Sequence, residues 1–171
     1  MSRVAKTLIT LLLVVGVDQY SKIMAKKMLL GKGVSSHFND MWRWVFAENT
    51  GAFLSWGSDL SGWVHVLFLK VIPVILIIGL LFYTMFSKEV TKNQVLPLAL
   101  ILGGGIGNLY DRLLYGKVID FMNIGIGDLR TGIFNVADMA IMAGIFWLLF
   151  VGLKKKPDDK KKEEVTTLRE L

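Results

Sequence analysis

The sequence predicts an α-helical integral membrane protein with four transmembrane helices and a small β-structured platform on the outer side of the membrane. Three observations predict this fold class. Apolar residues make up 53% of the 171 residues, and the mean hydropathy of +0.52 is too high for an ordinary soluble domain. The apolar residues are concentrated in four long runs. The segment between the first two runs is rich in tryptophan and phenylalanine.

We expect the four spans at about residues 7–24, 63–86, 95–114 and 133–153, because each run has roughly the 17–25 residues that cross a bilayer as a helix. The first run resembles a signal peptide, since Arg3 and Lys6 precede it. However, no A-x-A cleavage site follows, and Asp18 and Gln19 interrupt the run, so we expect an uncleaved helix. Residues 1–153 are therefore expected to form one membrane-embedded domain.

Two segments outside the spans differ from them in composition. The first, at about residues 25–62, is expected to form a small β-structure on the outer surface that cradles a substrate, and a plain belt of interfacial aromatics is the alternative. Its aromatic residues are Trp42, Trp44, Phe46, Phe53, Trp56 and, at the end, Trp63. Residues 154–171 alternate basic and acidic side chains around Pro157, so we expect a disordered cytoplasmic tail.

Basic residues next to the spans predict the orientation of the chain in the membrane. They precede the first span, lie in the connection at residues 87–94 and follow the fourth span: Arg3, Lys6, Lys88, Lys92 and Lys154 to Lys156. With four spans these three regions lie on one side, which should be the cytoplasm. Basic residues in the outer segment weaken the signal: Lys26, Lys27, Lys32 and Arg43. We still expect both termini in the cytoplasm.

The composition excludes several kinds of chemistry. The chain has no cysteine, which excludes thiol nucleophiles, disulfides, Cys-ligated zinc and iron–sulfur clusters. Its histidines are His37 and His65, and no H-E-x-x-H pattern is present, so we do not expect a zincin-type metalloprotease. The net charge of +6 does not indicate nucleic-acid binding, because seven basic residues lie after Leu153 and no basic domain with interleaved aromatics exists.

Polar side chains gather at the outer ends of the predicted spans. Four aspartates and three asparagines fall near the same leaflet: Asp18, Asp111, Asp120, Asp138, Asn49, Asn108 and Asn135. We expect Asp138 roughly one and a half turns inside the last span, about 8 Å along the helix. A carboxylate at membrane depth costs roughly 2.5–3.5 kcal/mol, so such a residue indicates a function.

Two of the aspartates have a basic residue at a favourable spacing. Lys22 lies four residues after Asp18, so an ion pair on one helical face should satisfy that carboxylate. Asp111 adjoins Arg112, whose guanidinium can clamp a nearby carboxylate or backbone carbonyl. We expect these residues to be structural or to orient a substrate.

Asp120 and Asp138 are the candidates for catalysis, because neither has an obvious local cation. Lys117 lies three residues before Asp120, but Gly116 and two β-branched residues argue against a helix there. Two close carboxylates cannot both ionise, so they share one proton. The ionised group draws a proton from water, and the protonated group hydrogen-bonds the scissile carbonyl and passes protons onward. This chemistry hydrolyses a peptide without a metal or a nucleophilic side chain.

Gly103 and Gly107 are small residues four apart, which favours close helix packing in the bilayer over a phosphate-binding loop. That packing should bring Asn108 near the neighbouring helices. From the residues alone, two further functions remain open. A small proton-coupled transporter also uses intramembrane carboxylates, although the cytoplasmic halves of the four spans lack Asp and Glu. A non-catalytic membrane assembly factor is the other, but it does not explain unpaired acids.

Five short blocks, in this order along about residues 7–153, resemble the bacterial lipoprotein signal peptidases, the signal peptidase II family. The blocks are Asp18-Gln-x-x-Lys22, Glu48-Asn-Thr-Gly-Ala52, Gly107-Asn-Leu-Tyr-Asp-Arg112, Val118-Ile-Asp-Phe121 and Phe134-Asn-Val-Ala-Asp138. Each block alone is weak, but together they are highly specific. Where many members read Asn-x-Gly-Ala-Ala-Phe, this chain reads Asn49-Thr-Gly-Ala-Phe-Leu54.

The resemblance implies an intramembrane aspartic endopeptidase that removes signal peptides from prolipoproteins by cleaving before the diacylglyceryl-modified cysteine. It implies Asp120 and Asp138 as the catalytic pair. It also implies polar positions around the substrate or the inhibitor globomycin, namely Asn49, Gly51, Asn108, Arg112 and Asn135, and supporting residues, namely Asp18, Lys22 and Asp111. We expect a monomer without a cofactor in the bacterial inner membrane, in contact with lipid, with its active site near the outer leaflet.

Overall fold

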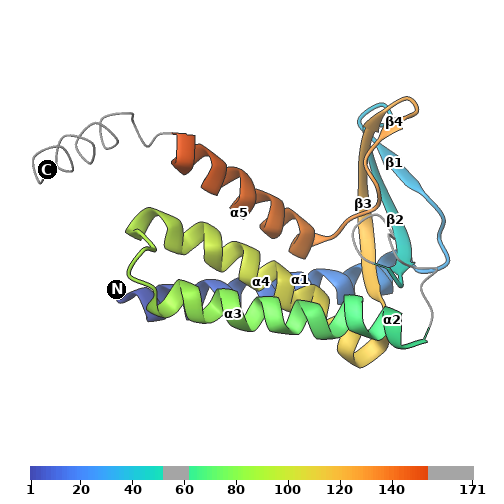
Figure 1. Ribbon diagram of the computed structural model, residues 1–171. Coiled ribbons are helices and arrows are strands. Elements are labelled where there is room, and N and C mark those ends of the chain that lie inside the picture. The colour runs from blue at the N-terminus through green and yellow to red at the C-terminus, as the bar shows by residue number, and fades with distance from the viewer. Residues whose placement is uncertain (52–61, 154–171) are drawn as a thin grey trace, which may run out of the picture.

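The computed structural model describes residues 1–51 and 62–153, which form a helical bundle with a small antiparallel sheet across one end (Figure 1). The long helices are α1 (Arg3–Leu29), α3 (Ile72–Phe86), α4 (Lys92–Tyr115) and α5 (Val136–Leu153). α4 packs more extensively than any other long helix against the remaining three and is therefore the central helix. The mainly helical fold with a small sheet agrees with the predicted class. The predicted tail at 154–171 and the aromatics Phe53 and Trp56 lie outside the described residues.

Helix α1 is longer at both ends than the span predicted at 7–24. At its start the Ser2 hydroxyl accepts a hydrogen bond from the Ala5 N–H, which caps the first turn. At its end Lys26 and Lys27 occupy the last turn, where positive side chains interact favourably with the helix dipole. The helix continues through Asp18 because that carboxylate is paired inside the bundle, so the polar break in the apolar run does not break the helix.

The second predicted span is one continuous helical rod with an irregular turn. It consists of α2 (Gly62–Val66), the π-helical segment η2 (Leu67–Val71) and α3. The Ile72 N–H donates to the Leu67 carbonyl, five residues back, immediately before Pro73. Proline lacks an N–H and crowds the preceding turn, so the wider turn accommodates it without ending the helix. This rod and α1 are long and apolar enough to cross a membrane, whereas the apolar part of α5 is shorter.

Helix α4 has clear end signals. Thr91 and Gln94 form a capping box at its start, and Gly116 ends it in the left-handed conformation at φ 72°. The expected glycine packing is confirmed and extends to a third glycine. A Cβ on Gly103 would lie 2.7 Å from the Val14 Cβ of α1, and one on Gly104 would collide with the Ala137 carbonyl of α5. The glycine run therefore allows close approach on two sides of α4.

The sheet contains β1 (Ser35–His37), β2 (Trp42–Asn49), β3 (Val118–Ile126) and β4 (Leu129–Arg130), paired in that order. Strands β1 and β2 confirm the predicted β-structure in the first connecting segment. Strands β3 and β4 come from the connection between α4 and α5, where the sequence had argued only against a helix. β2 pairs with β3 in a register that places Ala47 opposite Asp120, after an irregularity between Trp44 and Ala47.

The sheet stands across the ends of the helices, while the N-terminus and the α3–α4 connection lie at the opposite end of the bundle (Figure 1). Arg3 ties that opposite end together, because its guanidinium donates to the carbonyls of Ser87 and Val90. Where sheet and bundle meet, Ala25, Phe121 and Met122 form a buried apolar cluster. The outward faces of the helices remain apolar and exposed, as expected for surfaces in contact with lipid.

Candidate active site

Asp120 and Asp138 reach the same place from different elements. Asp120 lies on β3 and is 3% exposed, whereas Asp138 lies in the first turn of α5 and is half-buried. Asn135 bridges them. Its side-chain Nδ2 donates to Asp120 Oδ1 at 2.6 Å, and its backbone N–H donates to Asp138 Oδ2 at 3.0 Å. A single fully buried residue therefore fixes the relative position of the two carboxylates.

Asp138 lies nearer to the helix start than predicted. We expected it roughly one and a half turns into a span beginning near residue 133, but α5 begins at Val136 and Asp138 is its third residue. The reason is a reciprocal cap: Asn135 Oδ1 accepts from the Asp138 N–H at 3.0 Å, while Asp138 accepts from the Asn135 N–H. The Asp138 carboxylate thus lies at the positive end of the α5 dipole.

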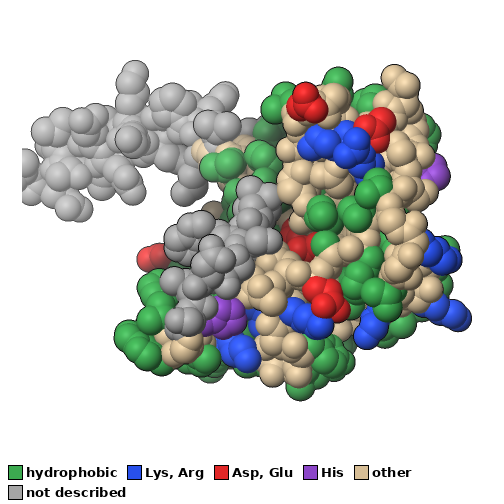
Figure 2. Space-filling view, turned by 90° about the vertical axis from the view of Figure 1, so that its right-hand side faces the viewer, with side chains coloured by type: hydrophobic (Ala, Val, Ile, Leu, Met, Phe, Trp, Pro, Cys, Tyr) green, Lys and Arg blue, Asp and Glu red, His purple; other side chains and the backbone are tan. Residues whose placement is uncertain are grey.

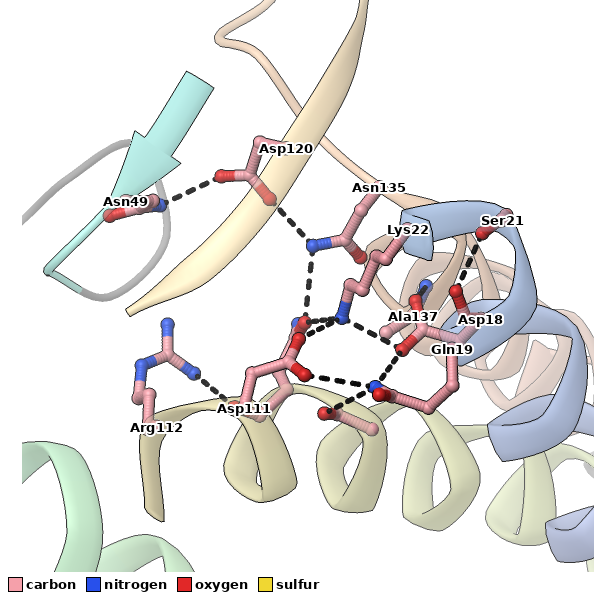
Figure 3. Close-up of polar contacts among 12 residues, drawn as sticks. Asp18, Gln19, Ser21, Lys22, Asn49, Asp111, Arg112, Asp120, Asn135 and Ala137 are labelled. Atoms are coloured by element: carbon pink, nitrogen blue, oxygen red, sulfur yellow. Dashed lines mark hydrogen bonds and ion pairs between the residues drawn. The ribbon is translucent and has the colours of Figure 1, made fainter. Parts of the chain in front are cut away.

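Asp120 is held from its other side by Asn49, the last residue of β2 (Figure 3). Asn49 Nδ2 donates to Asp120 Oδ2 at 2.9 Å, and Asn49 Oδ1 accepts from the Gly51 N–H at 2.9 Å. Burial raises the pKa of Asp120 to about 6, the nearby Asp138 charge adds to this, and the hydrogen bonds from Asn49 and Asn135 oppose it. A carboxyl group with this pKa keeps its proton to a higher pH than an ordinary aspartate.

A second cluster lies deeper in the bundle, around the ammonium group of Lys22 (Figure 3). Lys22 Nζ lies 2.7 Å from Asp18 Oδ2 and 2.7 Å from Asp111 Oδ2, and it donates to Asn108 Oδ1 at 2.9 Å. The predicted Asp18–Lys22 pair is therefore present. Asp111 pairs with this lysine and not with its neighbour Arg112, because adjacent helical residues point in different directions.

Asn108 connects the lysine cluster to the two carboxylates. Because Lys22 and Asn135 Nδ2 both donate to Asn108 Oδ1, the Asn108 amide nitrogen must face the other way. It donates to Asp138 Oδ1 at 2.8 Å. The buried charge of Lys22 therefore sets the orientation of an amide that contacts a candidate catalytic group.

Arg112 contacts backbone, one of the two possibilities that the sequence left open. Its Nη2 and Nε both donate to the Gly51 carbonyl, at 2.8 and 3.3 Å, and its Nη1 lies 3.4 Å from the Asn108 carbonyl. The guanidinium thus fixes the chain where it leaves β2, next to the amide that holds Asp120. Lys117 points elsewhere, as expected, and pairs with Glu48 at 2.6 Å.

All ten residues singled out in the sequence fall into one connected network, but two features were not foreseen. First, Asp120 and Asp138 do have partners, and these are neutral amides rather than cations. Second, Gln19 takes part: its Nε2 lies 3.1–3.3 Å from Asp18, Asp111 and the Gly107 carbonyl. The sequence offered one signal for the participation of Gln19, namely its position beside Asp18 within an apolar run. Across residues 1–51 and 62–153, no three His, Asp or Glu side chains form a group that could hold a metal ion.

An apolar cleft opens beside Asp138. It has a volume of about 470 Å³ and lies between η2, α3, α4 and α5. Asn108, Arg112 and Asp138 form its polar end, and the remainder is lined mainly by apolar side chains, including Leu76, Ile141 and Ile145. A long apolar ligand can therefore lie against the helices while a polar bond within it meets Asp138.

Fold and site together are those of a helical protein with long apolar helices and a pair of carboxylates held by hydrogen bonds. The comparisons with known proteins identify the family. The model of the signal peptidase (SPase) II family matches residues 10–154. The lipoprotein signal peptidase of Xanthomonas axonopodis pv. citri is 36% identical over 87% of this chain and 86% of its own length, and that of Tolumonas auensis is 43% identical over 68% and 71%.

Two solved structures described as bacterial membrane enzymes have the same fold. One superposes with a TM-score of 0.73 at 27% identity, covering 90% of this chain and 93% of the other. The second has a TM-score of 0.74 at 25% identity, with coverages of 89% and 95%. The chain belongs to the signal peptidase II family and is a peptidase. This membership gives no support to the transporter and assembly-factor alternatives.

Proposed function

We propose that this peptidase removes signal peptides from prolipoproteins by cleaving before the diacylglyceryl-modified cysteine, with Asp120 and Asp138 as its catalytic pair. The observation that carries the proposal is the pairing itself. Two carboxylates from β3 and α5 are joined through Asn135, and one of them, Asp138, lies at the polar end of an apolar cleft.

The two carboxylates differ in a way that suggests their roles. Asp120 is the more buried, and its pKa of about 6 suits it to hold the shared proton and donate it toward the scissile carbonyl oxygen. Asp138 lies at the start of α5, where the helix dipole stabilises an anion, so it takes the proton from the attacking water. The hydroxide equivalent adds to the carbonyl carbon, and collapse of the adduct with proton transfer to the leaving nitrogen breaks the peptide bond.

The polar residues around the pair hold it in place and meet the substrate backbone. Asn49, Asn108 and Asn135 donate their amide protons to the carboxylates in the free enzyme. With substrate bound, these amides and the Gly51 segment held by Arg112 line the path of the scissile peptide. Asp18, Lys22 and Asp111 lie one layer further in and support Asn108.

The cleft beside the carboxylates is suited to the apolar part of the substrate. Its apolar wall runs along α3 and α5, and α4 forms its floor with Gly105 and Leu109. A signal peptide is itself an apolar helix, so it can leave the bilayer laterally and lie along this wall. The lipid chains on the substrate cysteine remain in the membrane while the bond to be cut meets Asp138.

We further propose four membrane-spanning segments, with both termini in the cytoplasm of a bacterial cell and the active site near the outer leaflet of the inner membrane. A contact of Arg3 supports placing the N-terminus and the α3–α4 connection on the same side of the membrane, because its guanidinium donates to the carbonyls of Ser87 and Val90. The sheet, whose strand β3 carries Asp120, and the start of α5, which carries Asp138, lie at the other end of the bundle. The network is assembled within a single chain, which supports a monomeric enzyme.

The proposal is tested with Asp120→Asn and Asp138→Asn, because asparagine keeps the size and polarity of the side chain but cannot share a proton. Purified variants in nanodiscs should lose cleavage of a diacylglyceryl-modified prolipoprotein while retaining a cooperative melting transition. Asp128→Asn is the matched control. Asp128 lies exposed in the turn between β3 and β4, so this variant should cleave the substrate normally. Near-normal turnover by either folded dyad variant would overturn the assignment.

A further inference from the structure

A second cavity lies on the opposite side of β3 from Asp120. It has a volume of about 550 Å³, within the range of small-molecule sites, and lies between the last three turns of α1 and strands β1 to β3. Phe121 lines this cavity. Because successive strand residues point to opposite faces, Asp120 points the other way, toward Asn49 and Asn135. We call this cavity the α1 groove. It shares no lining residue with the cleft beside Asp138.

The inner wall of the α1 groove is well ordered by packing. Trp44 and Phe121 stack with ring centroids 6.1 Å apart and an interplanar angle of 9°. Phe121 is 4% exposed and Ala25 is 6% exposed, so the wall is part of the buried cluster where sheet and bundle meet. The outer rim is open, since Tyr20 is 66% exposed and Met28 is 55% exposed.

The position of the groove in the membrane follows from α1, which is long and apolar enough to cross the bilayer. Tyr20, Met24 and Met28 line the groove from the last turns of this helix, where it leaves the hydrocarbon region. An apolar groove at this level faces acyl chains on one side and lipid headgroups on the other. This placement holds whichever leaflet the end of α1 occupies.

The charge at the rim of the groove is strongly one-sided. Lys26, Lys27 and Lys32 are exposed, and the sequence has no Asp or Glu between Gln19 and Asn39. Lys26 lies three residues before Leu29 and Lys27 three residues after Met24, so each adjoins a groove residue on the helix surface. The Lys32 N–H donates to the Leu29 carbonyl at 3.0 Å. Basic side chains gather along the lower right edge of the face in Figure 2.

We propose that the α1 groove binds one anionic glycerophospholipid of the surrounding bilayer. One acyl chain lies between α1 and the Trp44–Phe121 wall, and the phosphate pairs with the lysines at the rim. The apolar lining selects an acyl chain, and three exposed lysines in a stretch of sequence without Asp or Glu select a net negative headgroup over a zwitterionic one. The site is separate from the cleft proposed for the substrate, so it can be tested without reference to catalysis.

The test uses the absence of cysteine from the chain to place one fluorophore at a time. A bimane label is attached to Ser35→Cys at the groove or, as a matched control, to Leu12→Cys on the exposed apolar face of α1. Both proteins are placed in phosphatidylcholine nanodiscs that contain a minor fraction of either brominated phosphatidylglycerol or brominated phosphatidylcholine. The ratio of quenching by the two brominated lipids is then measured at each label.

We expect this ratio to be several-fold higher at Ser35→Cys than at Leu12→Cys. Adding Lys26→Gln, Lys27→Gln and Lys32→Gln should lower it to the Leu12→Cys value, whereas the charge-matched control Lys6→Gln, Lys88→Gln and Lys92→Gln should leave it unchanged. Melting curves confirm that each variant is folded. Equal ratios at the two labels, or a ratio that survives loss of the three rim lysines, would overturn the proposal. Relief of quenching by added prolipoprotein would also overturn it, by assigning the groove to the substrate.

Discussion

At Asp120, the cost of burial that makes the carboxyl group useful also makes the fold dependent on pH. The pKa rises from 3.8 to about 6 on folding, so between these values the folded chain binds more protons than the unfolded chain. The contribution of Asp120 to the free energy of unfolding is therefore fully present below about pH 4. It falls by on the order of 3 kcal/mol as pH rises through about 6.

This pH dependence can be measured with Asp120→Asn, which removes the titrating group. As pH rises from about 4 to about 7, the Tm of the wild-type protein in detergent should fall relative to the Tm of the variant. The comparison cancels the titration of groups that do not interact with Asp120. A difference in Tm that stays constant over this range would contradict the raised pKa.

A second prediction at the residue scale concerns Lys22. Lys22→Met should lower stability by about 3–5 kcal/mol, because it leaves two buried carboxylates without their cation. It should also reduce cleavage, since the Asn108 amide loses one of the two donors that orient it. Lys117→Met is the control: its ion pair with Glu48 is about 40% exposed on both sides, so it should cost at most about 1 kcal/mol. Equal unfolding midpoints in the two variants would refute the buried cluster.

At the scale of elements, the contact between α4 and α5 positions Asp138. Gly104→Ala would drive a methyl group into the Ala137 carbonyl, one residue before Asp138. We expect a cost of about 1–3 kcal/mol and a marked loss of cleavage, because α5 must move and its first turn carries the carboxylate. Gly79→Ala on α3 meets nothing within 4 Å and should be neutral or slightly stabilising. Cleavage rates and melting curves of both variants check this, and normal cleavage by Gly104→Ala would count against it.

The elements also show how far the sequence could lead. Hydropathy found the helical regions, and i, i+4 spacing found the Asp18–Lys22 pair. The sequence could not show that residues 118–130 complete the sheet begun by β1 and β2, because pairing between β2 and β3 is a long-range contact without a local signal. The position of Asp138 was misjudged because hydropathy marks the apolar run, whereas the Asn135 cap sets where the helix begins. The amide partners of both carboxylates depend on tertiary packing in the same way.

At the scale of the whole molecule, the sheet and the α3–α4 connection lie at opposite ends of the bundle, which gives the proposed topology a direct test. Asp128→Cys lies in the exposed β3–β4 turn, and Lys88→Cys lies exposed between α3 and α4. In intact spheroplasts an impermeant maleimide should label the first and leave the second unlabelled until the membrane is opened. Labelling of Lys88→Cys from outside would reverse the proposed orientation.

The hydrogen bond from the Ala137 N–H to Asp18 Oδ1 joins residues 119 positions apart, and it has a consequence for biogenesis. At a synthesis rate of about 5–20 residues per second, roughly 6–24 seconds pass between translation of the first helix and of the last. During that interval the nascent chain already contains Asp18, Lys22 and Asn49. It still lacks Ala137, which donates to Asp18, and Asp138, the second carboxylate of the pair. We therefore expect the newborn enzyme to acquire activity in a single step, when the ribosome releases α5 for insertion, so that proteolysis begins only after translation of the bundle is finished.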